Sequence, residues 1–185
     1  MDSLTNKNFG FAIAYLLPGF VLLGGLSTHF DLISDWMLGL NLESDATIGG
    51  FLYSTLTALL LGLICSTIRW LVVDTLHHAT GIARPNWNYE SLQDKLGAYS
   101  LLEENHYRYY QFYGNTTVAW VAAFFLWRLS ETAVASFRMD LGAIMVTLLL
   151  YSGSRDTLTK YYRRVEALLS IPRKRVPIRH RIRFL

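Results

Sequence analysis

The stretch from Ile48 to Val73 constrains the fold of this chain more than any other part of the sequence. It runs for 26 residues with a single charged residue, Arg69. At about 1.5 Å of rise per residue, its uncharged part over 48–68 forms a helix of roughly 30 Å, the thickness of the hydrocarbon core of a bilayer. We therefore expect a membrane-spanning helix here, with the Arg69 side chain extended toward the membrane surface.

Small side chains recur at every fourth position along this stretch. Residues four apart share one face of a helix, and small ones let a second backbone approach closely. The small-residue stripe consists of Gly50, Ser54, Ala58, Gly62 and Ser66. It predicts close packing against another helix, and we expect the contact to extend between subunits of a homo-oligomer.

Three further apolar runs are candidate spans, at about 9–27, 116–130 and 135–153. Pro18 in the middle of the first predicts a kink, which neighbouring helices tolerate in a membrane. Charged residues make up 17% of the chain, against roughly 25% in soluble domains. The sequence thus predicts an all-α fold in which residues 1–153 form an integral membrane bundle of four transmembrane helices.

The polar segments are expected to lie on one side of the membrane. The segment 79–115 forms a helical insert, with a short helix predicted over Tyr89–Leu96 and ended by Gly97. Residues 154–185 form an amphipathic helix and a basic tail. Lys and Arg residues gather in these two segments, whereas the connection 28–47 holds neither. The positive-inside rule therefore predicts a multi-pass protein of the inner cell membrane with both termini in the cytoplasm.

The tail is the most strongly charged feature of the sequence. Six basic residues fall within eleven positions: Arg173, Lys174, Arg175, Arg179, Arg181 and Arg183. Each is attracted to anionic lipid headgroups by about 1 kcal/mol, so membrane lipids are the first partner we expect. A cytoplasmic protein and a nucleic acid are the other partner classes that such a tail fits.

Two acid–histidine motifs are the candidates for a metal or catalytic site. Asp74, His77 and His78 follow the long apolar run, and Glu103 precedes His106 by three residues. Helical bundles use this spacing in carboxylate-bridged metal sites, but such sites also need further carboxylates on facing helices. The sequence supplies no clear set of these, so solvation of a helix end is the simpler interpretation. We expect no metal or cofactor.

The sequence favours a function without catalysis, since no nucleophile motif or phosphate-binding loop stands out. The first hypothesis is an oligomeric membrane protein acting as a pore, sensor or membrane effector. It would receive a signal or dock a cytoplasmic partner through the insert and the tail, and its size and layout resemble those of bacterial antiviral defence proteins. The alternatives are a membrane-embedded enzyme using the acid–histidine motifs on a lipid-soluble substrate, and a structural scaffold subunit.

Overall fold

The structure is a computed structural model that describes residues 10–38, 48–85, 87, 89–130 and 136–169. Every regular element in these ranges is a helix, which confirms the all-α class. All six basic residues of the tail lie outside the described residues, and lipid binding by the tail stays a prediction.

The helices follow one another with short connections. They are the π-helical turn η1 (Ala12–Leu16), α2 (Leu17–Leu26), α3 (Asp31–Leu38), α4 (Ile48–Leu71), α5 (Val73–Ala79), the 3-10 helix η2 (Tyr89–Lys95), α6 (Leu96–Leu102), the π-helical turn η3 (Glu103–Tyr107), α7 (Arg108–Leu129) and α8 (Phe137–Leu169).

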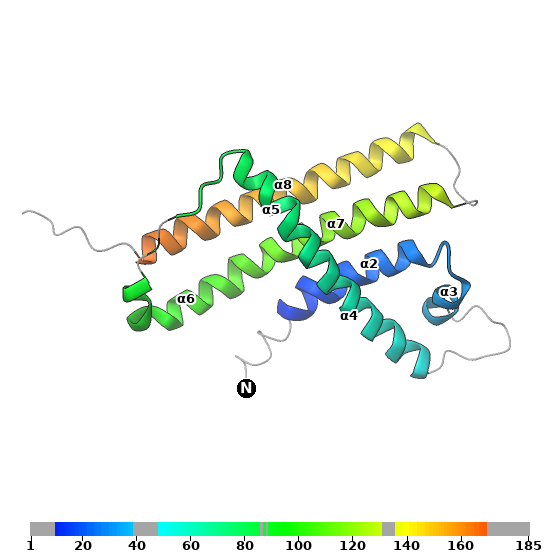
Figure 1. Cartoon of the computed structure of the whole chain (residues 1–185), viewed down its shortest axis with the longest axis horizontal. Coiled ribbons are helices and arrows are strands. Elements are labelled where there is room, and N and C mark those ends of the chain that lie inside the picture. Colours follow the sequence, from blue (N-terminus) through cyan, green and yellow to red (C-terminus); the bar gives the residue numbers. More distant parts are fainter. Residues whose placement is uncertain (1–9, 39–47, 86, 88, 131–135, 170–185) are drawn as a thin grey trace, which may run out of the picture.

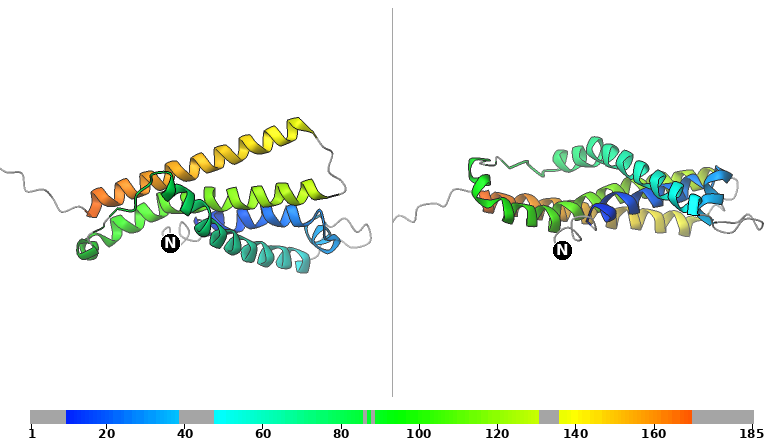
Figure 2. Two further views of the ribbon diagram at one scale, coloured as in Figure 1. Left: turned by 45° about the horizontal axis from the view of Figure 1, so that its top comes forward. Right: turned by 90° about the horizontal axis from the view of Figure 1, so that it is seen from below.

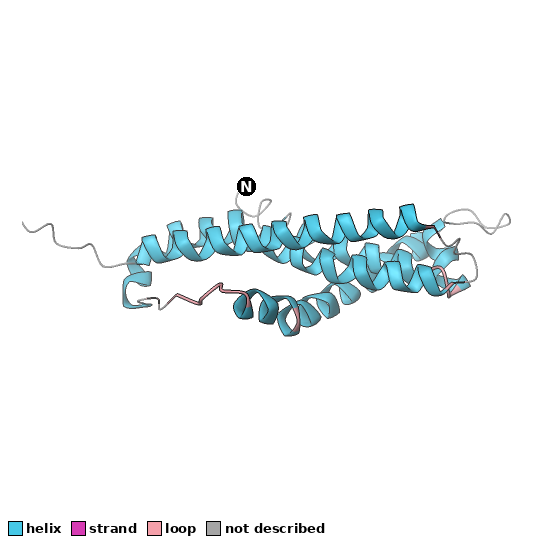
Figure 3. Ribbon diagram, turned by 90° about the horizontal axis from the view of Figure 1, so that it is seen from above, coloured by secondary structure: helices cyan, strands magenta, loops and turns pink. Residues whose placement is uncertain are grey.

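Helices α7 and α8 run antiparallel and side by side along the length of the molecule (Figure 1). Helix α2 lies along α7, and α4 crosses both obliquely (Figure 2). Because α2, α4 and α8 all contact α7, this helix is the centre of the bundle. Seen from above, the molecule is long and narrow, with the insert folded back over one end of α8 (Figure 3).

Glycines bring α2 and α4 into direct backbone contact. A Cβ atom at Gly19 would lie 1.6 Å from the carbonyl oxygen of Ala58, and one at Gly62 would lie 1.9 Å from that of Tyr15. The middle of the small-residue stripe is therefore buried against the first helix of the same chain. Ser54, Ala58 and Gly62 are buried there, while Gly50 and Ser66 are half-buried. A contact between subunits through this face stays a prediction.

The first helix is irregular where Pro18 predicts a kink. Pro18 has no N–H to donate to the carbonyl of Ala14, four residues earlier. The side-chain amide of Asn115 on α7 donates to that oxygen instead, at 2.7 Å. The π-helical turn η1 lies at the same place, so the disturbance is absorbed by a local change of helix type and by a neighbouring helix.

Within the described residues, one helical stretch is long and apolar enough to cross a membrane, namely Ile48–Ala79. Only 28% of its most apolar window is buried in the chain, whereas the core helix of a soluble protein is mostly buried. This suggests membrane association. Ala12–Leu26 is apolar but shorter. Helices α7 and α8 do not meet the same criterion of length and hydropathy. The four-span bundle thus stays a prediction.

Two local expectations differ from the structure. Gly97 lies inside α6 and does not end a helix, because η2 passes directly into α6 at Leu96. Helix α8 continues without a break past residue 153, where we expected the last span to give way to a separate amphipathic helix. The surroundings of the helix change at that point, but its backbone does not.

The α2–α4 contact predicts a strong effect of adding one methyl group. Gly19→Ala should lower the free energy of unfolding by at least about 1–3 kcal/mol, because the new Cβ overlaps the Ala58 carbonyl. Gly24→Ala on the same helix is the matched control, since no atom lies within 4 Å of its added Cβ. Detergent titration of the purified protein measures both, and equal stability of the two variants would contradict the close approach of α2 and α4.

Candidate functional site

Arg69 is buried inside the chain, whereas its expected extension toward a membrane surface stays a prediction. Its side chain is 5% exposed and that of Asp74 is 14% exposed. One guanidinium nitrogen, Nη1, donates to both carboxylate oxygens of Asp74, at 3.0 and 3.3 Å. The guanidinium carbon lies 4.8 Å from the centre of the Tyr110 ring, close enough for a cation–π interaction. A carboxylate within reach on the next helix keeps this arginine inside.

Gly114 on α7 provides the space that the buried arginine occupies. A Cβ atom at this position would lie 2.6 Å from Cδ of Arg69 and 3.3 Å from the hydroxyl of Ser154 on α8. The arginine side chain therefore passes directly over the backbone of α7. Any larger residue at position 114 would push it out.

Tyr110 completes what we call the Arg69–Asp74–Tyr110 cluster. Its hydroxyl donates to the Oδ1 atom of Asp74. Burial, above all, raises the pKa of this phenol, so it stays protonated and serves as a donor. The carboxylate of Asp74 is thus held by a cation and a hydroxyl at once, and the cluster joins the end of α4 to α5 and α7.

The two histidines of the first acid–histidine motif have separate roles. Nε2 of His77 lies 3.0 Å from the Ser154 hydroxyl, and both residues are completely buried. This pair ties α5 to α8 and has no access to a substrate. Nδ1 of His78 lies 2.5 Å from the carbonyl of Asp74, while its Nε2 accepts a bond from Nε of Arg84 at 3.1 Å. These partners place the His78 proton on Nδ1.

The second motif does not join the first in a metal site. His106 faces Arg164 on α8. Burial and, second, the Arg164 charge lower the pKa of His106. In the described part of the chain, no three His, Cys, Asp or Glu side chains are grouped so that they could hold a metal ion. Glu103 does line the same cavity as Asp74.

This cavity has a volume of about 460 Å³ and lies where the insert folds back onto α5, α7 and α8. We call it the aromatic cavity, because most of its lining is aromatic. The rings are Trp70, Trp87, Tyr89, Tyr99, Tyr107, Tyr110, Tyr161 and Tyr162, and the charged residues are Asp74, Glu103 and Arg84. The cluster described above therefore forms part of its wall.

The rings hold one another in place. Trp87 meets Tyr161 and Tyr162 edge to face, with ring centres 6.0 Å apart in both pairs. The hydroxyls of Tyr99 and Tyr161 lie 3.1 Å apart. Lys95 donates to the carbonyl of Leu168 at 2.5 Å, which fixes the insert to the end of α8. Contacts of this kind between aromatic rings are favourable and define the orientation of each ring.

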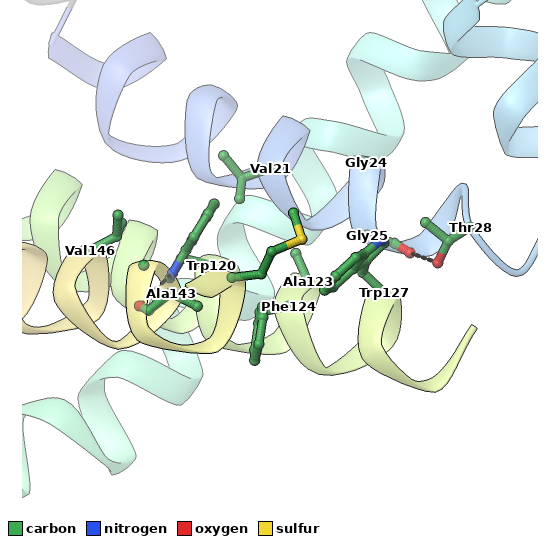
Figure 4. Close-up of a pocket in the computed structure, with 12 residues that line it drawn as sticks. Val21, Gly24, Gly25, Thr28, Trp120, Ala123, Phe124, Trp127, Ala143 and Val146 are labelled. Atoms are coloured by element: carbon green, nitrogen blue, oxygen red, sulfur yellow. Dashed lines mark hydrogen bonds between the residues drawn. The ribbon is translucent and has the colours of Figure 1, made fainter. Parts of the chain in front are cut away.

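A second cavity, of about 510 Å³, lies between α2, α7 and α8 (Figure 4). We call it the apolar cavity, since its walls are formed by Trp120, Phe124, Trp127 and small or aliphatic side chains. The Thr28 hydroxyl and the Trp120 indole N–H both donate to backbone carbonyls, at 2.7 and 3.3 Å. These two groups therefore present no free donor to an occupant.

Comparisons with protein families, with characterised proteins and with solved structures found no match to this chain.

The sequence predicted one possible cluster, formed by Asp74, His77, His78, Glu103 and His106. The structure places Asp74 and Glu103 in the lining of one cavity. His77 is buried elsewhere, against Ser154. Sequence reasoning did not predict a cavity lined by aromatic rings. The signal was present in the density of Tyr and Trp within the insert and in the adjacent pair of tyrosines at 161–162.

The lowered pKa of His106 predicts a pH-dependent stability. The unfolded chain binds this proton near pH 6.5, whereas the folded chain binds it only at lower pH. Between these two pKa values the unfolded state holds more protons, so stability should fall as the pH falls through 6.5. His106→Asn should flatten this part of the curve, and Arg164→Gln should flatten it partly. Thermal unfolding between about pH 5.5 and 7.5 measures the slope; a slope that both variants leave intact would exclude His106 as its origin.

Proposed function

We propose that this chain is a multi-span integral membrane protein that acts as a sensor. The aromatic cavity binds a ligand on the cytoplasmic side. The Arg69–Asp74–Tyr110 cluster couples this binding to the packing of the helices. One observation carries the proposal. Asp74 lines the cavity with one part of its surface and holds a buried arginine between the helices with its carboxylate.

Exposed apolar side chains support a bilayer location. On α4 and α8 they form long rows: Phe51, Leu52, Leu56, Leu60, Leu63 and Ile64 on α4, and Leu141, Ile144, Met145, Leu148 and Leu149 on α8, all at least 43% exposed. Soluble monomers rarely expose contiguous apolar surface on this scale. The four proposed spans are Ala12–Leu26, α4, the second half of α7 and the first half of α8.

The coupling follows from the energetics of a buried charge. Arg69 is almost inaccessible to water, so removing its carboxylate partner leaves an uncompensated charge in the interior. A ligand that competes for Asp74 therefore favours any arrangement in which Arg69 finds another partner. Its effect is limited to the difference between its affinities for the two arrangements. Since Arg69 rests on Gly114, the first helix to respond is α7.

The geometry favours this sensor over the membrane enzyme. The one serine–histidine pair of the described residues is completely buried, and the Asp74 carboxylate is already bonded to Arg69 and Tyr110. A homo-oligomer remains part of the proposal, with the exposed apolar rows of α4 and α8 as the available surfaces. Ion flux in liposomes distinguishes a sensor that opens a pore from one that signals to a partner.

Labelling of introduced cysteines tests the four-span topology. The only native cysteine, Cys65, is buried and can be replaced by alanine. In that background, His29→Cys and Ser136→Cys should react with an impermeant maleimide from the outside of intact cells. Ser100→Cys should react only after the membrane is opened, because the insert lies inside. Reaction of Ser100→Cys and Ser136→Cys from the same side would refute the topology.

The native Cys65 thiol tests the coupling in the unmodified background. It is buried where α4 meets Leu22 of α2 and Ala119 of α7. Asp74→Asn should cost about 3–5 kcal/mol of folding free energy, because Arg69 loses its counter-charge. It should also speed the reaction of Cys65 with a membrane-permeant maleimide, measured by mass spectrometry at a temperature where the variant stays folded.

Asp156→Asn is the control for this experiment. It breaks an exposed ion pair with Lys160, worth less than about 1 kcal/mol. An equal labelling rate of Cys65 in both variants and the wild type would remove the coupling from the proposal, even if the stability loss were found.

A further inference from the structure

The polar groups of the aromatic cavity call for a ligand with a positive and a negative end. We propose that the cavity binds a phospho-alkanolamine, in which an alkylammonium and a phosphate are joined by a short linker. The inference deepens the proposed function, since it names the ligand class of the same site. Its two possible sources are the headgroup of a zwitterionic phospholipid and the free phospho-alkanolamine.

The ammonium end is assigned to the rings and to Glu103. Aromatic faces attract cations, and cages of several rings are the common way in which proteins recognise quaternary ammonium groups. Asp74 is already engaged by Arg69 and Tyr110, so an ammonium reaches its carboxylate only in competition with Arg69, as the coupling in the proposed function requires. The Glu103 carboxylate, in contrast, lines the cavity and has no hydrogen bond or ion pair with the described residues, so it is the negative charge available to face a cation.

The phosphate end is assigned to Trp87 and Arg84. The indole N–H of Trp87 is buried and has no acceptor among the described residues. A buried donor without a partner is unfavourable, and a turn of the Trp87 ring toward the cavity that it lines would bring the N–H to an oxygen of a ligand. Arg84 lines the same cavity and uses Nε for His78, which leaves other guanidinium donors for a phosphate.

The balance of charge selects a zwitterion over a simple cation or anion. The negative charges of Asp74 and Glu103 at the cavity are matched by Arg69, which lies behind Asp74, and by Arg84. A choline-like ion or a phosphate alone would leave one charge of the cavity unmatched. A phospho-alkanolamine leaves the net charge of the site unchanged, because its ammonium pairs with a carboxylate and its phosphate pairs with an arginine.

A neighbouring groove favours a lipid as the source. It runs along α5 and is lined by Leu71, Thr75 and Ala79, and it shares Trp70, Asp74 and Arg84 with the aromatic cavity. Leu71 and Trp70 are more than half exposed and continue the apolar row of α4. A headgroup in the cavity could therefore extend its acyl chain along this groove toward the hydrocarbon.

Binding of phosphocholine and phosphoethanolamine to the full chain in detergent tests the proposal, with choline and inorganic phosphate as the separated halves. Titration calorimetry should show both halves binding at least about tenfold more weakly than the joined ligands. Trp87→Phe, which keeps a ring but removes the N–H, and Glu103→Gln should each weaken binding of phosphocholine by about tenfold. Asp156→Asn should leave the affinity within about twofold.

The result that overturns the inference is binding that does not need both ends. Choline that binds with the same affinity as phosphocholine would overturn it. So would an unchanged affinity for phosphocholine in Trp87→Phe and Glu103→Gln, once the unfolding midpoint shows that both variants are folded. No binding of either joined ligand, together with no copurified zwitterionic lipid, would also overturn it.

Native mass spectrometry distinguishes the two sources. A phosphatidylethanolamine or phosphatidylcholine molecule retained by the wild type in nanodiscs, but not by Trp87→Phe, identifies the lipid headgroup. Retention of phosphatidylglycerol at the same level would count against a zwitterionic site. Binding of the soluble compounds without lipid retention identifies the free phospho-alkanolamine.

The labelling rate of Cys65 separates this inference from the proposed function. Ligand binding that changes the rate supports both. Binding with an unchanged rate leaves the ligand assignment in place and contradicts the sensor. Absence of binding overturns the assignment, while the topology and the Asp74→Asn result still decide the proposed function.

Discussion

The buried ion pair between Arg69 and Asp74 is the interaction on which the arrangement of this molecule depends. A guanidinium in the interior is stabilised when its charge is matched by a nearby carboxylate, and Arg69 has such a partner although its Nε atom has no acceptor among the described residues. Asp74 supplies the charge, the Tyr110 ring supplies its π face, and Gly114 supplies the space. Replacing any of these three residues would destabilise the buried position of Arg69. One side chain therefore fixes the ends of α4, α5 and α7 relative to one another.

The insert is held by a different kind of contact. Aromatic rings from the insert pack against Tyr161 and Tyr162 of α8, and Lys95 binds the carbonyl of Leu168 near the end of that helix. Rings pack edge to face because their positive edges meet negative faces, and this leaves faces free for a cation. The same geometry that holds the insert in place therefore lines the cavity with groups suited to a charged ligand.

The buried ion pair and the aromatic cavity share one residue, Asp74. Its backbone carbonyl accepts from His78, its carboxylate holds Arg69 and Tyr110, and its side chain lines the aromatic cavity. In the sensor that we propose, a ligand at the cavity and the packing of the helices compete for the Asp74 carboxylate. Packed helices usually respond to such a change by moving between discrete arrangements, which is the physical basis of a sensor.

The sequence by itself determined the all-helical class, the apolar Ile48–Ile68 run, and the small-residue stripe that allows a close backbone approach. These follow from local composition and periodicity, which act within one helix. It did not determine the partner of the stripe, the inward turn of Arg69 or the aromatic cavity. Each of these joins residues tens of positions apart, such as Asp74 with Tyr110 and Trp87 with Tyr161. Only the tertiary structure decided them, because a side chain takes the direction in which its charge or ring finds a partner on another helix.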